Sequence, residues 1–153
     1  MDSRNKDSCK SVAPEEQFFV AILRAADSLS QDSEQLIKSA GLTGAQYNVL
    51  RILRGAQPAG LPCSGIGERM ISHDPDMTRL LDRMEKRNLI TRQRQKDDRR
   101  VVKTHITEEG LALLKKLDLP VRDLHKRQFQ NLSQSRLKAL GRLLAELGNR
   151  EST

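Results

Sequence analysis

Apolar residues recur at helical spacing along several stretches of the chain, and the breaks between these stretches divide it into elements. Between residues 15 and 41 they lie three or four positions apart, which predicts a helix that stops near Gly41. Thr43 followed by Gln46 has the form of a capping box and predicts the start of a second helix. After a loop rich in proline and glycine, a short third helix is expected over residues 64–70.

The next stretch combines a narrow apolar stripe with a polar face. Asp74 suits the N-cap and Pro75 the first helical position. Asp76 can accept a hydrogen bond from a cytosine amino group or simply face solvent. The stripe repeats at positions i, i+3, i+4 and i+7, which are Met77, Leu80, Leu81 and Met84. The residues off the stripe supply a hydroxyl and several cations, at Thr78, Arg79, Arg83 and Lys86.

Strand-like sequence follows this fourth helix. The β-branched stretches 89–92 and 101–106 flank a polar segment and predict a long β-hairpin with a basic tip. Thr107 is expected to cap a further helix, which Pro120 should kink or break into two. Ser133 is expected to cap a last helix.

The order of a helix, a short helix, an amphipathic basic helix and a basic hairpin is that of a winged helix-turn-helix. The fold class is therefore expected to be mainly α, with a wing of two or three β-strands. A major groove of B-DNA admits one α-helix, and a narrow minor groove attracts inserted arginine. The candidates for DNA contact on these grounds are Thr78, Arg79, Arg83 and Lys86 of the helix, His73 just before it, and Arg99 and Arg100 at the hairpin tip.

The charge of the chain is concentrated in two blocks. Of the 153 residues, Lys and Arg contribute 27 and Asp and Glu 20, which gives a net charge of +7. Residues 79–103 hold ten basic and four acidic residues, a local charge of +6, and residues 115–150 carry a second +6. A solvated helix face explains many such runs, but this one crosses a helix, two strands and their turn, which favours a binding surface for a polyanion. Aromatic residues make up only 3%, which argues against stacking platforms for single strands.

Other chemistry has little support in the sequence. Cys9 and Cys63 fit a reducing compartment, and the scattered histidines lack the neighbours of a metal site. No cofactor is expected, and no constellation for catalysis is recognisable, so the protein is not expected to be an enzyme. No apolar run reaches the length of a membrane span, and the N-terminal residues lack the apolar centre of a signal peptide, so a cytoplasmic location without membrane attachment is expected.

The stretch from Leu42 to Leu114 resembles the MarR family of bacterial transcriptional regulators. The matching segments are LTGAQYNVLRIL, IGERM, DMTRLLDRMEKRNLITRQR, DDRRVVKTHITEEG and LALL. The wing pattern of Asp98, Arg99 and Arg100 followed closely by Thr107 is fairly specific in combination with the TRLLDR helix. The loop before Cys63 and the turn MISHDP depart from the pattern of many relatives.

The resemblance implies a homodimer that addresses a pseudo-palindromic duplex. The expected organisation is a flexible tail over residues 1–14, a dimerisation helix over 15–41, the DNA-binding domain over 42–110, and dimerisation helices over 111–150. The apolar stripes of the first and last helices point the same way, because terminal helices gain little without a partner; both can instead fold back on their own core.

The resemblance also assigns roles to residues. It implies base contacts for Thr78 and Arg79, and a phosphate or base contact for Arg83. Arg100 would reach the minor groove, and Asp98 would hold the wing by pairing with a neighbouring arginine. The residue implied for a phosphate contact at the start of the third helix is Ser64.

Small-molecule and redox regulation are further expectations. MarR-like proteins often bind small aromatic or anionic effectors, and Tyr47 can line such a pocket, although a lone tyrosine on an apolar stripe is more often a core residue. Cys63 permits a redox switch, whereas two inert thiols are the simpler interpretation.

The predicted function is a sequence-specific, duplex-DNA-binding transcriptional regulator, in the first instance a repressor that a small molecule can relieve. The alternative is a non-specific or architectural DNA-binding protein, whose affinity depends on salt and not on sequence.

Overall fold

The computed structural model describes residues 13–95, 98 and 100–148. The elements follow one another as α1 (Pro14–Ser39), α2 (Gly44–Gly55), β1 (Leu61–Pro62), α3 (Cys63–Gly67), α4 (Met77–Lys86), β2 (Ile90–Arg94), β3 (Val102–Ile106), α5 (Glu108–Gln128) and α6 (Gln134–Gly148). This confirms the predicted mainly helical class with a small β-wing. Of the expected N-terminal tail over residues 1–14, residues 1–12 lie outside the described residues, as do Cys9 and Arg99, whereas Pro14 already belongs to α1.

The residues at the helix ends explain several of these boundaries. Pro14 occupies the first turn of α1, where its missing N–H costs nothing. The predicted capping box at α2 is present, since the Thr43 hydroxyl accepts from the Gln46 N–H at 3.2 Å and the Gln46 side chain accepts from the Thr43 N–H at 3.1 Å. Thr107 caps α5 by accepting from the Gly110 N–H at 3.1 Å.

The core lies where α2, α3, α4 and the sheet meet the first half of α5. We call the part from α2 to β3, residues 44–106, the winged lobe. The core is built from apolar side chains that are almost completely buried, among them Val49, Leu50, Ile66, Leu80, Leu81, Met84 and Ile90 of this lobe and Leu114 of α5. The predicted inward stripe of α4 is therefore confirmed at three positions, and Met77 is half-buried.

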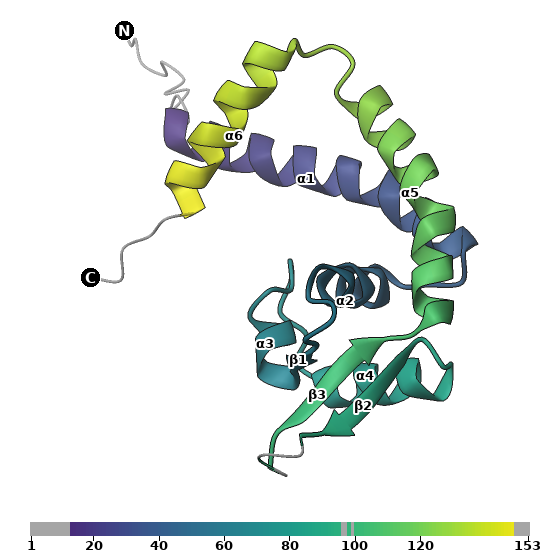
Figure 1. Cartoon of the computed structure of the whole chain (residues 1–153). Helices are drawn as coiled ribbons and strands as arrows, with labels where there is room; N and C mark the ends of the chain where they lie inside the picture. The colour runs from purple at the N-terminus through teal and green to yellow at the C-terminus, as the bar shows by residue number, and fades with distance from the viewer. Residues whose placement is uncertain (1–12, 96–97, 99, 149–153) are drawn as a thin grey trace, which may run out of the picture.

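The sheet has three antiparallel strands in the order β1-β3-β2. In the β2–β3 hairpin Ile90 pairs with Ile106, and Arg94 pairs with Val102 next to the connecting turn. The short β1 pairs with the other edge of β3. The hairpin extends away from the body of the protein (Figure 1).

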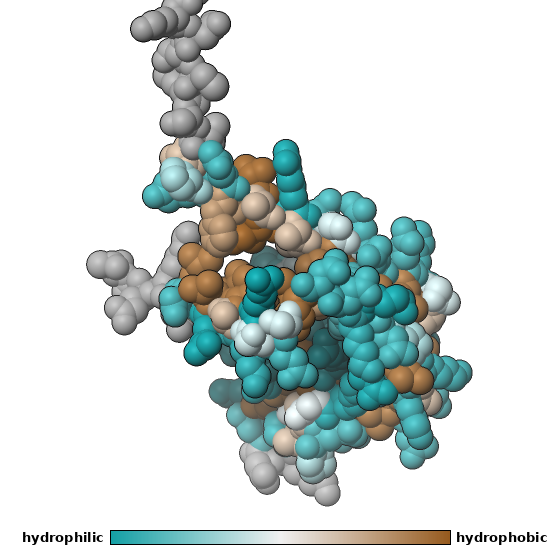
Figure 2. All heavy atoms as spheres, turned by 90° about the horizontal axis from the view of Figure 1, so that it is seen from above, coloured by the Kyte–Doolittle hydropathy of each residue, from teal (hydrophilic) through white to brown (hydrophobic). Residues whose placement is uncertain are grey.

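The three long helices α1, α5 and α6 lie on one side of the winged lobe, and α5 joins the two parts (Figure 1). α5 packs against both α1 and α2. By contrast, no residue of α6 is buried. Exposed apolar side chains gather on the first half of α1 and on α6 (Figure 2), and they include Phe18, Phe19, Leu23, Leu143, Leu144 and Leu147.

The structure corrects the prediction for the start of α4. Asp74 is not the N-cap, because its Oδ1 accepts from the Asp76 N–H at 2.8 Å and forms a local turn. The helix starts two residues later than expected, at Met77, with Asp76 as N-cap. The third helix is also shorter than predicted and ends at Gly67.

Of the two outcomes expected for Pro120, a kink or a break in the helix after Thr107, the break does not occur. Pro120 lies inside α5, which continues to Gln128. A proline removes one backbone hydrogen bond from a helix. The contacts of α5 with α1 and α2 hold the remaining helix together, including a bond of 3.0 Å from the Gln128 amide to the Leu29 carbonyl.

Candidate nucleic-acid interface

The helix α4 presents a polar face to solvent. Leu80, Leu81 and Met84 turn inward, while the residues off this stripe are exposed, namely Thr78, Arg79, Arg83 and Lys86. The structure thus places all four predicted contact residues of this helix on an exposed surface. A hydroxyl and three cations at helical spacing form a row that fits the width of a DNA groove.

Asp76 organises the beginning of this face. Its carboxylate accepts the Arg79 N–H at 3.3 Å, and its other oxygen lies 3.2 Å from the Arg79 guanidinium Nε. Asp76 therefore caps the helix and pairs with Arg79, while its side chain remains 49% exposed. The Arg79 side chain is still 79% exposed.

A second ion-paired cluster ties α4 to the wing. The guanidinium of Arg92, on β2, donates to Glu85 at 2.9 and 2.6 Å and to Asp82 at 2.5 Å. The Arg92 backbone N–H also donates to Glu85 at 3.1 Å. The hydrogen bond to Glu85 is the main cause that raises the pKa of Arg92 above its ordinary value.

Arg92 therefore holds β2 against α4, although it also contributes to the positive charge of residues 79–103. This role was not predicted from the sequence. Its signal was the pair of acids at 82 and 85, three positions apart on a helix that the next strand packs against.

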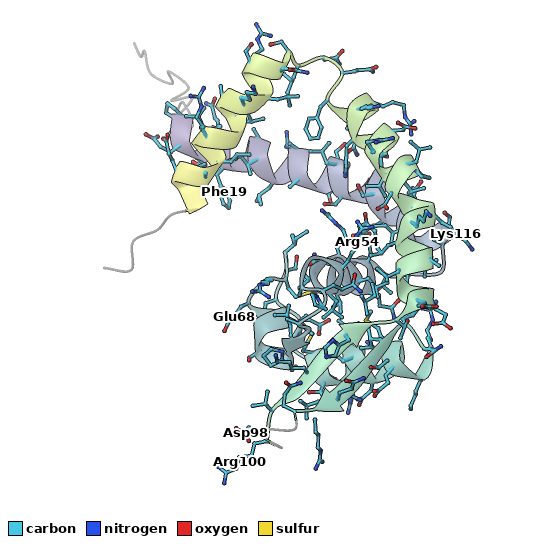
Figure 3. The ribbon with its side chains drawn as sticks, viewed as in Figure 1. Phe19, Arg54, Glu68, Asp98, Arg100 and Lys116 are labelled. Carbon is cyan, nitrogen blue, oxygen red and sulfur yellow. The ribbon has the colours of Figure 1, made fainter. Side chains whose placement is uncertain are left out.

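The wing carries the remaining basic residues. Asp98 and Arg100 lie at the far end of the hairpin, where Arg100 points away from the body (Figure 3). The carboxylate of Asp98 accepts from the Arg100 backbone N–H at 3.0 Å, and its carbonyl accepts from the Val101 N–H at 3.0 Å. Within the described part of the wing, Asp98 thus shapes the turn through the backbone, whereas the expectation was a pair with an arginine side chain.

The two predicted phosphate contacts precede α4. Ser64 is exposed in the first turn of α3, and His73 is exposed in the segment between α3 and α4. This segment is anchored by Asn48 of α2, whose side-chain oxygen accepts from the Ile71 N–H at 2.8 Å. No sequence pattern identified Asn48, because its partner lies 23 positions away.

A cavity of about 670 Å³ lies between α2 of the winged lobe and the helices α5 and α6. Its charged lining is mainly cationic, with Arg51, Arg54, Arg122 and Lys126 and the single acid Asp118, and His125 adds an imidazole. Arg54 points from α2 toward this space (Figure 3) and binds both oxygens of Asp118 on α5 at 2.9 Å. The apolar lining comprises Val121, Phe129, Leu132 and Leu137.

Tyr47 is both a core residue and a lining residue of this cavity, the two interpretations that the sequence left open. Its side chain is only 9% exposed and belongs to the core, yet it also lines this cavity. Burial raises the pKa of the phenol, and Arg51 lies over the ring at 5.8 Å from its centroid.

Other predicted features can be placed as well. Cys63 is free and exposed at the start of α3. In the described ranges, no group of three or more His, Cys, Asp or Glu side chains is placed to hold a metal ion. None of the helices described here is long and apolar enough to cross a membrane.

An exposed basic helix beside a β-hairpin wing, on a lobe with a helix-turn-helix order, defines the class of winged helix-turn-helix DNA-binding proteins. The sequence model of the MarR family matches residues 42–102. A MarR transcription factor from Planctomyces limnophilus is 35% identical, with 89% of this chain and 98% of that one covered and a TM-score of 0.67. The chain belongs to the MarR family of transcriptional regulators.

Two further relatives extend over most of the chain. The homoprotocatechuate degradative operon repressor of Escherichia coli is 26% identical over 137 residues, which are 88% of this chain and 91% of the relative. BpsR of Bordetella bronchiseptica, whose DNA binding is regulated by 6-hydroxynicotinic acid, has a TM-score of 0.76. It is 22% identical, and the match covers 88% of this chain and all of that one.

Proposed function

We propose that this regulator is a repressor that binds a pseudo-palindromic duplex as a homodimer. The observation that carries the proposal is the exposed row of a hydroxyl and three cations on α4, in the same lobe as a basic wing. A helix and a wing on one rigid body can enter a major groove and the adjoining minor groove together. The similarity to a repressor over 91% of its length supports the direction of regulation.

Each candidate residue has a role in this arrangement. Thr78 and Arg79, in the first turn of α4, contact base edges, where recognition helices make such contacts. Arg83 and Lys86 lie one and two turns further along the exposed face and contact phosphate or bases. The residues proposed for phosphate are Ser64 and His73, and those proposed for the minor groove are Arg99 and Arg100.

The division of the chain follows from the same proposal. Residues 42–110 bind DNA, and residues 15–41 and 111–150 form the dimer. The exposed apolar side chains of α1 and α6 need a partner surface, because exposed Phe19 and Leu143, at 62% and 56%, are costly in a monomer. A second copy of the chain supplies this surface and doubles the length of DNA that is read.

The cavity beneath α5 is the proposed site of a small aromatic anion. Four cationic side chains and the imidazole of His125 line it together with one carboxylate, and Tyr47 with Phe129 offers apolar contact. Such a ligand competes with Asp118 for Arg54 and changes the bond between α2 and α5. Benzoate should release wild-type protein from duplex but should have less effect on Arg54→Gln; Lys116→Gln, on α5 outside this lining, is the control.

Fluorescence anisotropy tests the proposed DNA binding. The full chain is titrated with duplex from its own upstream region and with a scrambled duplex, over a series of salt concentrations. A specific regulator should bind its operator about 10³- to 10⁷-fold tighter than random duplex, and Arg79→Ala should reduce this ratio. If neither the upstream duplex nor a duplex selected from a random library is bound more tightly than scrambled duplex, the protein binds DNA without regard to sequence and the proposal is wrong.

A further inference from the structure

The carboxylate of Asp76 performs two tasks at the N-terminus of α4. One oxygen caps the helix through the Arg79 N–H at 3.3 Å. The other lies 3.2 Å from the Nε of the same arginine. Asp76 thus restrains both the backbone and the side chain of one residue.

This contact leaves the terminal end of the Arg79 guanidinium available to bind a base. The Nε atom forms the ion pair with Asp76, whereas the two terminal nitrogens of the guanidinium have no hydrogen-bond partner among the described residues. The side chain is 79% exposed. Its terminal fork is the group that donates two parallel hydrogen bonds to the O6 and N7 atoms of guanine.

Holding the guanidinium before binding also reduces the cost of ordering it. A free arginine loses rotamer freedom when an interface immobilises it, and a restrained one loses less. The ion pair itself adds little to folding, because Asp76 is 49% exposed and such pairs are weak in water. Its value therefore lies in the geometry of Arg79.

We propose that Asp76 is a positioning residue that presents Arg79 to a guanine in the major groove and so determines specificity at that base pair. This inference rests on the proposed function, in which α4 enters the groove. Asp76 acts through Arg79 and does not itself contact the base.

The negative charge of Asp76 allows the proposed positioning role to be distinguished from a purely electrostatic one. A carboxylate near the DNA repels phosphates and lowers the affinity for every sequence. Positioning of Arg79 raises only the affinity for the correct sequence. Removal of the charge should therefore raise the affinity for an unrelated duplex and lower the preference for the correct base pair. A purely electrostatic role would instead raise the affinities for the correct and the unrelated duplex alike.

The test uses the full chain and a duplex selected by it from a random library. Affinities are measured for that duplex, for the three other base pairs at the guanine read by Arg79, and for an unrelated duplex. Asp76→Asn keeps a good N-cap and removes the charge, so the helix should still form. Asp74→Asn is the matched control, because it removes the same charge two residues away and retains the acceptor for the Asp76 N–H.

We expect Asp76→Asn to lose about threefold or more of the guanine preference, part of the roughly 5- to 150-fold discrimination of a bidentate contact. Asp74→Asn should keep the preference. In an Arg79→Ala background, Asp76→Asn should have no further effect on base preference, because its target is missing.

Three results would overturn the inference. An unchanged guanine preference in Asp76→Asn would mean that Arg79 needs no restraint. An effect that persists in the Arg79→Ala background would mean that Asp76 contacts a base itself, as an acceptor for cytosine. An equal loss in Asp74→Asn would reduce the role to charge. If the wild-type chain selects no sequence at all, the proposed function fails and this inference fails with it.

Discussion

Three capping side chains decide, residue by residue, where α2, α4 and α5 begin. Thr43, Asp76 and Thr107 each accept the backbone N–H three positions further on. Two of these caps could be predicted, because each is a hydroxyl directly before a helical pattern. The third could not, since Asp74 and Asp76 are equally suitable by residue type and the bond of Asn48 to the preceding segment helps to set the path of the chain.

Gly110 is required where α5 passes over the hairpin. A Cβ at this position would lie 2.5 Å from the backbone oxygen of Leu89, which no side-chain rotation can move. We expect Gly110→Ala to lower the free energy of unfolding by about 1–3 kcal/mol, because the packed backbone must shift. Urea denaturation measures the change.

Gly141→Ala is the control for this substitution. Gly141 lies in α6, and a methyl group added at this position would meet nothing within 4 Å. This variant should be neutral or gain up to about 1 kcal/mol from helix propensity. If both alanine variants behave alike, the close approach of Leu89 to Gly110 does not constrain the fold.

Tyr47 offers a spectroscopic test of its burial. The chain has one tyrosine and no tryptophan, so tyrosinate absorbance reports this residue alone. Burial raises its pKa in the folded protein above 10.0. The folded state thus binds the phenol proton more tightly, and this contribution to stability is present below pH 10 and lost as the pH rises through the folded pKa.

The titration midpoint of Tyr47 should therefore lie above 10 in buffer and return to about 10 in denaturing urea. In Tyr47→Phe, the fall of stability above about pH 10 should be smaller. Equal midpoints in buffer and in urea would contradict the burial of the phenol.

Among the elements, α4 and β2 are coupled by a cluster of opposite charges. Arg92 bonds Asp82 and Glu85 on α4, so α4 and the wing keep one relative orientation. The periodicity of the sequence predicted both elements to within about two residues. It did not predict their coupling, because side-chain pairing depends on how a strand lies against a helix.

Arg92→Gln should lower the free energy of unfolding by about 1 kcal/mol, because it leaves two neighbouring carboxylates without their cation. The loss should be smaller than for a fully buried pair, since Asp82 and Glu85 are 44% and 38% exposed. Thermal and urea denaturation at low and high salt measure the effect.

Arg94→Gln provides the comparison for this change, because Arg94 lies on the same strand, is exposed, and makes no ion pair within the described residues. Arg92→Lys should restore only part of the loss, since an ammonium cannot form the parallel bonds of a guanidinium. Equal stability of the Arg92→Gln and Arg94→Gln variants would exclude the coupling role.

In the protein as a whole, α1 and α6 expose apolar side chains that no other part of the described chain covers. The helical periodicity of the sequence predicted both apolar stripes. It did not predict whether they pack on the chain's own core. In the structure α6 buries no residue, and Phe18, Phe19 and Leu23 of α1 stay exposed. This outcome favours a second copy over an internal partner.

Phe19→Ser and Leu144→Ser should shift the protein from dimer to monomer, because each replaces an exposed apolar side chain of this surface by a polar one. Sedimentation velocity measures the state, and operator affinity should fall with the dimer. Ile71→Ser is the control, since Ile71 is 83% exposed but lies in the winged lobe. A wild-type chain that sediments as a monomer would refute the assignment of this surface.

The order of elements, the inward stripe of α4 and the exposure of Thr78, Arg79, Arg83 and Lys86 could all be predicted from the amino-acid sequence. These features follow from local periodicity and capping, which act over three or four residues. The pairing of charges emerged only in the folded chain, as for Arg54 with Asp118 across 64 positions. The cationic cavity and the contact of Asp76 with the Arg79 side chain emerged there too, because such contacts depend on the path of the packed backbone and not on the spacing of residues along the chain.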